Sequence, residues 1–273
     1  MRTRPGARHR DVSGKALMQA IVLAAGYATR LYPLTENVAK PLLPVAGRPM
    51  LDYLIDAIRE VDEIDAIHVV TNHKFAQDFT DWASAHSDVT VHDDGTTSED
   101  DRLGAIGDIA FVVDRADLNA DDILVIAGDN LFDYSLADYV NWWRGKGDAS
   151  AVVLYDVGDL DLVKKYSSVD VDGDDRLTSL TEKPEHPTST LVATAAYIYH
   201  RSHVALVHTY LAEANSPDQP GRFLVWLVPR APVFGYTATG DWRDIGDAQQ
   251  LLDADNALRE RAGLPTRTAY SLD

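Results

Sequence analysis

The sequence predicts an α/β fold in which a doubly wound sheet, mixed but mostly parallel, is flanked by helices. Three continuous apolar runs are short enough to be strands buried on both faces, at residues 20–25, 66–70 and 123–127. Stretches that we expect to be helical lie between them, at residues 50–61, 74–86 and 103–115. Strands and helices that alternate in this order favour a parallel, doubly wound sheet.

The first strand leads into a turn of small residues. Gly26 permits backbone angles and a close ligand approach that a side chain would block. Arg30 follows this turn, and Lys40 stands ten residues later. Free backbone N–H groups and two cations together suit a polyphosphate. A tight turn followed by two solvated surface cations is the alternative interpretation.

The rest of the first half predicts shorter elements. They are expected in this order: an extended segment at 42–45, a turn at 46–49, a strand at 89–91 and an acidic loop at 92–102. The buried strand at 123–127 then delivers Asp129 to its carboxyl end. Ligands of open parallel sheets bind beyond such strand ends.

The pattern changes near Ser168, where a hairpin is expected. The elements of the second half are a helix at 139–145, a strand at 149–155, hairpin strands at 168–171 and 177–181, a strand at 191–199, helices at 204–214 and 222–228, a last strand at 232–238 and a closing helix at 247–261. The sequence shows no internal repeat or linker. One domain over residues 18–273, ending in a C-terminal helix, is therefore the economical prediction.

Composition narrows the class of protein. Hydrophobic residues make up 45% of the 273 positions, which is enough for a sizeable core. Because the chain has no cysteine, disulfides, thiolate metal sites and cysteine nucleophiles are excluded, and a cytoplasmic location fits. No apolar run approaches the ~20 residues needed to span a bilayer. Residues 1–17 lack the apolar segment of a secretory signal, so we expect a disordered N-terminal extension.

The formal net charge of −18 bears on the partners. Such a surface repels nucleic acid and anionic membranes, so we expect neither as a partner. A protein this acidic that binds anionic substrates needs cations inside its site. Arg30, Lys40 and a bound divalent metal would supply them.

Two aspartates are candidates for that metal. Asp129 follows a buried strand, and Asp244 stands just before the final helix. A carboxylate next to a buried strand is costly unless it caps, hydrogen-bonds or holds a metal. Mg²⁺ takes one or two protein carboxylates, and phosphate oxygens and water complete its shell. A turn residue for Asp129 and a helix-cap neighbour for Asp244 are the simpler alternatives.

The opening stretch resembles the signature of the sugar-1-phosphate nucleotidylyltransferases. That family carries roughly L-A-A-G-x-G-T-R-L-x-P-L-T and then K-P-L-L-P-V. The chain has LAAGYATRLYPLT from Leu23 and KPLLPV from Lys40. One departure is Ala28, which replaces the second glycine of the family's loop. Its methyl group narrows the freedom of the backbone at that point.

The resemblance implies a Rossmann-like fold of the nucleotide-diphospho-sugar transferase type and a Mg²⁺-dependent reaction. A nucleoside triphosphate and a sugar 1-phosphate would give an NDP-sugar and pyrophosphate, and the resemblance leaves room for a homo-oligomer. By the same resemblance Asp129 and Asp244 hold the metal, and the catalytic residues are Arg30, Lys40 and Lys183. The implied nucleotide-binding residues are Leu23, Ala25, Gly26, Tyr27, Ala28, Thr29, Leu103 and Gly104.

The residues that would bind the sugar 1-phosphate, here called the sugar end, are the part of the family's pattern that transfers least well to this chain. Glu182 and Lys183 match a family tripeptide that serves the sugar hydroxyls and the sugar phosphate, and Thr194 and Trp242 complete the implied sugar-phosphate-binding set. The family's Y-G pair is Tyr166-Ser167 here, and Ala195 replaces another glycine. An ordinary turn with a solvated ion pair is the alternative for Glu182 and Lys183. The acidic loop occupies the base-recognition position but lacks the glutamine that thymidylyl and uridylyl members use.

Direct in-line displacement is the mechanism that these residues predict. A sugar 1-phosphate is a dianion near neutral pH, because its second pKa is ~6, so its oxygen needs no general base. Three alternatives stay open. The acceptor could be phosphocholine or a cyclitol phosphate, the chain could be a catalytically silent nucleotide-sugar-binding regulatory protein, or it could be a metal-dependent glycosyltransferase with a related sheet.

Overall fold

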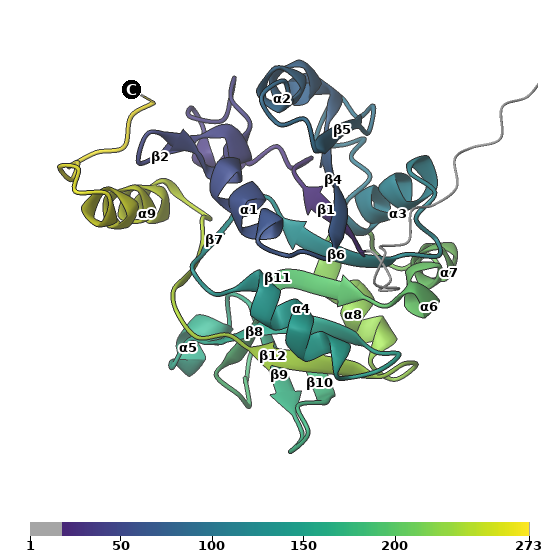
Figure 1. Ribbon diagram of the computed structural model, residues 1–273. Coiled ribbons are helices and arrows are strands. Elements are labelled where there is room, and N and C mark those ends of the chain that lie inside the picture. Colours follow the sequence, from purple (N-terminus) through teal and green to yellow (C-terminus); the bar gives the residue numbers. More distant parts are fainter. Residues whose placement is uncertain (1–17, 273) are drawn as a thin grey trace, which may run out of the picture.

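The computed structural model describes residues 18–272, and its elements surround a seven-stranded sheet (Figure 1). The strand order is β12-β8-β11-β6-β1-β4-β5. These strands are β1 (Met18–Leu23), β4 (Ile64–Thr71), β5 (Val89–Asp93), β6 (Asp122–Ala127), β8 (Ser150–Asp156), β11 (Leu191–Tyr199) and β12 (Val233–Thr237). Within this sheet β11 runs antiparallel to β6 and β8, whereas the other pairings are parallel. The predicted mixed, mostly parallel sheet is confirmed.

Helices cover both faces of the sheet. One face carries α1 (Met50–Arg59), α2 (Ala76–Ala83) and α4 (Leu136–Arg144), and the other carries α3 (Ala105–Arg115), α6 (Arg201–Val204), α7 (Leu206–Ala212) and α8 (Pro220–Leu227). Successive strand side chains point to opposite faces, so Ala20 and Val22 enter one core and Ile21 the other. Because both cores are apolar, the central strands read as continuous hydrophobic runs.

Several short elements differ from the sequence predictions. The strand at 232–238 is not the last, because β13 (Trp242–Asp244) follows it and pairs antiparallel with β7 (Asn130–Phe132). Residues 42–45 are extended only in β2 (Pro44–Val45), which pairs with β3 (Arg48–Pro49), while η2 (Lys40–Leu42) is a 3₁₀ turn. The helix expected at 204–214 corresponds to α7, and α6 precedes it as a separate short helix that was not predicted. The helix predicted at 74–86 begins as the 3₁₀ turn η3 (His73–Phe75) and continues as α2, whereas the short helix α5 (Leu160–Val163) was not predicted. The hairpin near Ser168 is confirmed as β9 (Ser167–Val171) and β10 (Leu177–Glu182).

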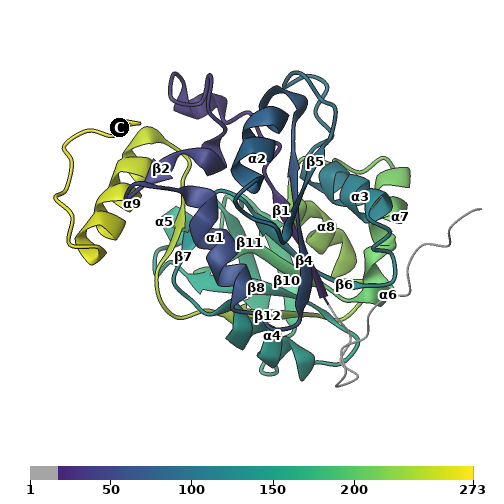
Figure 2. The same cartoon turned by 45° about the horizontal axis from the view of Figure 1, so that its top comes forward.

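The closing helix α9 (Ala248–Arg261) packs beside β2, as both views of the molecule show (Figures 1 and 2). Asp255 of α9 is 1% exposed, and its Oδ1 accepts a 2.7 Å hydrogen bond from the backbone N–H of Ala46. Tyr270 donates from its hydroxyl to the carbonyl of Pro44 at 2.7 Å. Residues near the end of the described chain therefore hold the segment that follows Lys40.

The expectation of a disordered extension at residues 1–17 lies outside the described residues. Within residues 18–272, no helix combines the length and the hydrophobicity needed to cross a bilayer.

Candidate active site

The loop after β1 is built on a left-handed residue. Ala28 has φ +48° and ψ +42°, and its carbonyl accepts a 2.8 Å hydrogen bond from the hydroxyl of Thr35. Ala195, in β11, also has a positive φ of +56°. These are two of the three positions where the chain replaces a glycine of the resembling family, and Ser167 is the third. Glycine adopts this conformation without steric cost. The chain thus keeps a glycine-like backbone at both positions despite the added methyl groups.

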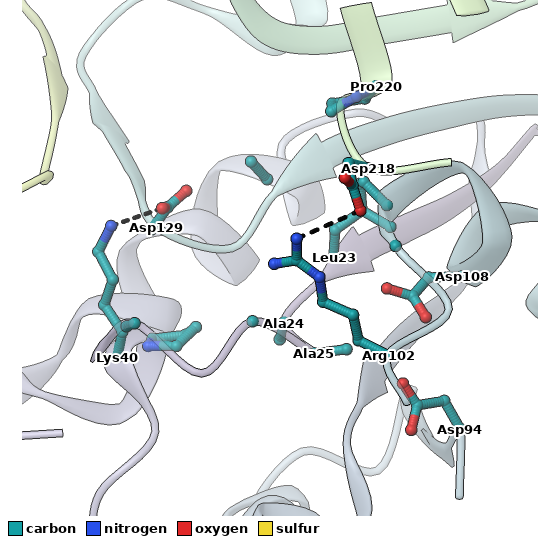
Figure 3. A pocket seen from close by; sticks show the side chains of 16 residues that line it. Leu23, Ala24, Ala25, Lys40, Asp94, Arg102, Asp108, Asp129, Asp218 and Pro220 are labelled. Atoms are coloured by element: carbon teal, nitrogen blue, oxygen red, sulfur yellow. Dashed lines mark hydrogen bonds and ion pairs between the residues drawn. The ribbon is translucent and has the colours of Figure 1, made fainter. Parts of the chain in front are cut away.

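Lys40 and Asp129 form a close ion pair at the carboxyl end of β6. The Lys40 side chain is 10% exposed, and its Nζ lies 2.5 Å from Oδ2 of Asp129, which is 33% exposed. Figure 3 shows the pair at one end of a pocket. A buried ammonium group requires such a partner, because removing it from water is otherwise costly.

Asp244 joins this pair through the β7–β13 ribbon. The ribbon places Asp244 opposite Asn130, which is the neighbour of Asp129 in sequence. Burial, and then the charge of Asp129, raise the pKa of Asp244, whereas Lys40 and Arg30 act in the opposite direction. Arg30 itself is exposed, in the short 3₁₀ turn η1 (Thr29–Leu31). The structure therefore brings together the two acids and two cations that the sequence singled out.

The two aspartates fit a magnesium ion. The charge of Asp129 disfavours the ionised form of Asp244, so a cation between the two carboxylates would relieve the repulsion. No group of three or more His, Cys, Asp or Glu side chains that could hold a metal occurs among residues 18–272. Mg²⁺ tolerates such a sparse protein contribution when substrate phosphates supply further oxygens. Asp129 and Asp244 are accordingly the candidate metal ligands.

A cavity of about 280 Å³, here called the inner cavity, lies beyond the carboxyl ends of β1 and β6 (Figure 3). Its wall is formed by Leu23, Ala24, Ala25, Gly26, Ala28, Lys40, Pro41, Asp94, Arg102, Gly104, Ala105, Asp108, Ala127, Asp129, Asp218 and Pro220. Five of the predicted nucleotide-binding residues are among them, namely Leu23, Ala25, Gly26, Ala28 and Gly104. Seven of these sixteen residues are alanine or glycine, and four are aspartates.

The other three predicted nucleotide-binding residues lie outside that wall. Tyr27 is 6% exposed and lies near the acidic loop, and burial raises the pKa of its hydroxyl. Thr29 is exposed in η1, and Leu103 is half-buried before α3. These side chains are placed to support the loops rather than to line the cavity.

A second cavity of about 190 Å³, here called the outer cavity, contains most of the predicted sugar end. Glu182, Thr194 and Trp242 line it, together with Asp129 and Asp244. Burial raises the pKa of Glu182, and the cations Lys183 and Arg222 act against that rise. Lys183 is exposed and is not part of the wall.

The polar groups of Thr194 and Trp242 are engaged within the protein. The Thr194 hydroxyl donates to the carbonyl of Val153 at 3.2 Å, so it points into the core. The Trp242 indole N–H donates to Oδ1 of Asn130 at 3.2 Å. Its ring lies 5.4 Å from that of Tyr166, between centroids, and these two rings form one side of the outer cavity.

Sequence reasoning missed two polar residues of the site. Asn130 is 3% exposed, and its Nδ2 also donates to the carbonyl of Thr194 at 2.5 Å. Asp108 is 5% exposed and lines the inner cavity. The signal for Asp108 was present in the sequence, because it is a lone acid inside the apolar run from Ile106 to Val113. A charge at such a position needs a partner.

Comparisons with known proteins agree with this architecture. A family model described as nucleotidyl transferase matches residues 19–261. The bifunctional protein GlmU of Methanocaldococcus jannaschii is 27% identical over 244 residues, which cover 89% of this chain and 55% of that protein. The UTP–glucose-1-phosphate uridylyltransferase AglF of Haloferax volcanii is 31% identical over 246 residues, which cover 89% of this chain and 97% of that protein.

A solved structure supports the same fold. The apo form of a UDP-glucose pyrophosphorylase superposes with a TM-score of 0.75 at 19% identity, and the match covers 90% of this chain and 99% of that one. The chain spans about half the length of several curated relatives that it matches, including the GlmU protein.

Proposed function

Because the chain belongs to the nucleotidyl transferase family, we propose that it joins a nucleoside triphosphate to a sugar 1-phosphate. The products would be an NDP-sugar and pyrophosphate. The names of the relatives support this reaction class, since AglF is described as a uridylyltransferase acting on glucose 1-phosphate.

One observation carries the proposal: the inner and outer cavities meet at Asp129. Ala127, Asp129 and Pro220 belong to both walls, while Asp244 belongs to the outer one. A triphosphate in the inner cavity and a phosphate ester in the outer cavity would therefore present their phosphates to the same carboxylate. Nucleotidyl transfer depends on this alignment of the two phosphates more than on a general base.

The charges at this meeting point suit two mutually repellent anions. Two unit charges ~4 Å apart repel by ~4 kcal/mol at an effective dielectric of ~20. Lys40 and Arg30 would reduce that repulsion on the triphosphate side, Lys40 from beside Asp129 and Arg30 from the exposed rim. Asp129 and Asp244 would hold Mg²⁺, which supplies positive charge to the phosphate oxygens when bound.

The acceptor would lie in the outer cavity. Glu182 is placed to accept hydrogen bonds from sugar hydroxyls, because its carboxyl lines that wall. The Trp242 and Tyr166 rings offer an apolar face to the acceptor. Lys183 lies on the exposed side of Glu182, so its side chain would swing toward the cavity to anchor the phosphate. The in-line displacement would then expel pyrophosphate.

Pyrophosphate release tests the proposal. We would assay the full chain with ATP, CTP, GTP, UTP and dTTP against hexose 1-phosphates, phosphocholine and cyclitol phosphates, with and without Mg²⁺. We expect turnover with at least one hexose 1-phosphate, and only with Mg²⁺. Turnover only with phosphocholine or a cyclitol phosphate would change the acceptor, and nucleotide binding without turnover would indicate a regulatory protein.

Single substitutions assign the roles at the meeting point. Asp129→Asn and Asp244→Asn should each lower kcat by about 10²-fold or more, because the phosphates lose their shared cation. Asp138→Asn is the matched control, since that carboxylate is exposed on α4 and lines neither cavity. Near-wild-type turnover in either of the first two variants would remove the metal assignment.

A further inference from the structure

The inner cavity has a second acidic end, remote from the Lys40–Asp129 pair. Asp94 follows β5 and Asp108 lies in the first turn of α3, and both line the cavity. Figure 3 shows their carboxyl groups facing one another on the side of the pocket opposite Lys40. If the triphosphate lies at Asp129, as the proposed function requires, this end would receive the nucleobase.

The two carboxyl groups are oriented by different contacts. Oδ1 of Asp94 accepts hydrogen bonds of 2.7 Å from both the backbone N–H and the hydroxyl of Thr96. Its Oδ2 is buried, as is Oδ1 of Asp108, and neither atom receives an N–H or O–H donor from the residues that the structure describes. These two oxygens therefore face each other, and a proton between them would satisfy both.

The remaining oxygen of Asp108 points the other way. Figure 3 shows one Asp108 oxygen directed toward Asp94 and the other toward the pocket. Burial, and then the adjacent Asp94, raise the pKa of Asp108 to about 8, which agrees with a shared proton. With that proton held between the two carboxyls, the cavity-facing oxygen can only accept. A ligand at this end must then present an N–H group, or a buried acceptor is left without a partner.

We propose that Asp108, positioned by Asp94, selects a nucleobase that presents an amino group, as adenine, cytosine and guanine do, over uracil and thymine. The hydrogen-bonding edge of uracil or thymine carries a carbonyl oxygen on each side of its single ring N–H. We place the exocyclic substituent of the base, and not its ring N–H, against Asp108, so a carbonyl of uracil or thymine would face the acceptor oxygen there and be repelled. An exocyclic amino group at the same point donates to it. Sites that hydrogen-bond a donor reject analogues that lack it, because their buried polar group stays unpaired.

Small residues lie among the walls of the cavity, namely Ala25, Gly104 and Ala105. A Cβ on Gly104 would lie 2.7 Å from the carbonyl oxygen of Pro217, so the backbone segments at Gly104 and Pro217 approach each other closely. Arg102 reaches across to Asp218, with 3.3 Å between the guanidinium group and the carboxylate (Figure 3).

Equilibrium binding tests the selection without knowledge of the acceptor. The dissociation constants of the full chain for ATP, CTP, GTP, UTP and dTTP would be measured by calorimetry. We expect at least one amino-bearing triphosphate to bind tenfold or more tightly than both UTP and dTTP. Replacing the amino group of the preferred triphosphate by hydrogen should weaken its binding by a similar factor. This arm uses the unmodified protein and does not depend on the folding of any variant.

Variants separate the two carboxylates. In Asp108→Asn the side-chain amide also offers a donor, so the preference should fall at least tenfold and UTP should gain. Asp94→Asn can still hold Asp108 through a hydrogen bond and should keep the preference, whereas Asp94→Ala should lose it. Asp100→Asn removes a charge from the same exposed loop and lines neither cavity, so it should change nothing.

The outcomes distinguish this inference from the function on which it rests. Tightest binding of UTP or dTTP, or an Asp108→Asn variant with an unaltered preference, would overturn the role of Asp108. If no triphosphate bound to the wild-type chain at all, the proposed transferase itself would be wrong.

Discussion

At the scale of single residues, the proton on Asp108 links stability to pH. Burial, and then Asp94, raise the pKa of Asp108 to about 8, whereas an aspartate in an unfolded chain titrates near ~4. The folded state therefore binds this proton more tightly. The contribution of this proton to the free energy of unfolding is full below pH ~4, and it is lost as the pH rises through about 8.

Asp108→Asn should abolish that dependence. The melting temperature of the variant, relative to that of the wild type, should rise between pH 5 and pH 8.5, because the amide never ionises. Thermal denaturation in a pH series measures the difference. The exposed Asp100→Asn variant serves as the control and should show a constant offset. A constant offset for Asp108→Asn as well would contradict the assigned pKa.

The sequence identified some site residues and missed others for physical reasons. Asp129 stood out because it interrupts the end of a buried strand. The sequence shows that Ala28 departs from the family's glycine. Its φ of +48° is set by the folded loop, so the residue type alone does not predict it. Asp108 was missed because its partner, Asp94, belongs to a different element, and only the folded chain places them together.

At the scale of elements, the β7–β13 ribbon sets the spacing of the site. Asn130 bridges it to the central sheet, since it donates to Thr194 of β11 and accepts from Trp242 of β13. The two flanking acids, Asp129 and Asp244, take their positions from this three-way junction. Three-residue strands show no periodicity, and the partners Asn130 and Trp242 are separated by 112 residues, so the pairing could not be predicted from the sequence.

Asn130→Ala should therefore destabilise the fold and weaken the site together. The substitution leaves a buried carbonyl and an indole N–H without partners, which costs ~1–3 kcal/mol for each. We expect the free energy of unfolding to fall by about 3 kcal/mol in urea titration, and kcat to fall even in protein that remains folded. Asn215→Ala, which removes a half-buried amide far from the ribbon, should cost about 1 kcal/mol. Equal losses in the two variants would show that the ribbon is not anchored by Asn130.

The longer elements were predictable because each carries enough residues to show a pattern. The β1, β4 and β6 runs and the α1 helix match their predicted positions to within a few residues. The helix predicted at 204–214 contains α7, but its first residue, Val204, belongs to the separate helix α6, because apolar spacing continues across the break at Ala205. A local pattern reports which face is apolar but not where the axis changes direction.

At the scale of the whole molecule, the net charge of −18 should make stability depend on salt. Like charges repel more strongly in the compact state than in the unfolded chain. The screening length falls from ~10 Å at 0.1 M to ~3 Å at 1 M salt. We therefore expect the melting temperature to rise by several degrees when KCl increases from 0.1 M to 1 M.

A charge-reduced variant supplies the control for that experiment. Asp62→Asn combined with Asp100→Asn removes two exposed carboxylates. Its melting temperature should respond less steeply to KCl than that of the wild type. A melting temperature that falls with added KCl would mean that attractive ion pairs outweigh the general repulsion.

The hydrogen bonds that join α9 to the segment after Lys40 have a consequence for the growing polypeptide. Asp255 and Tyr270 hold Ala46 and Pro44 across separations of 209 and 226 residues. On a ribosome, the first part of the sheet can collapse while the chain still lacks these braces and lacks Asp244. The second acid of the site is present only when translation has passed Asp244, just before α9, so a chain that stops earlier would leave Lys40 facing Asp129 alone.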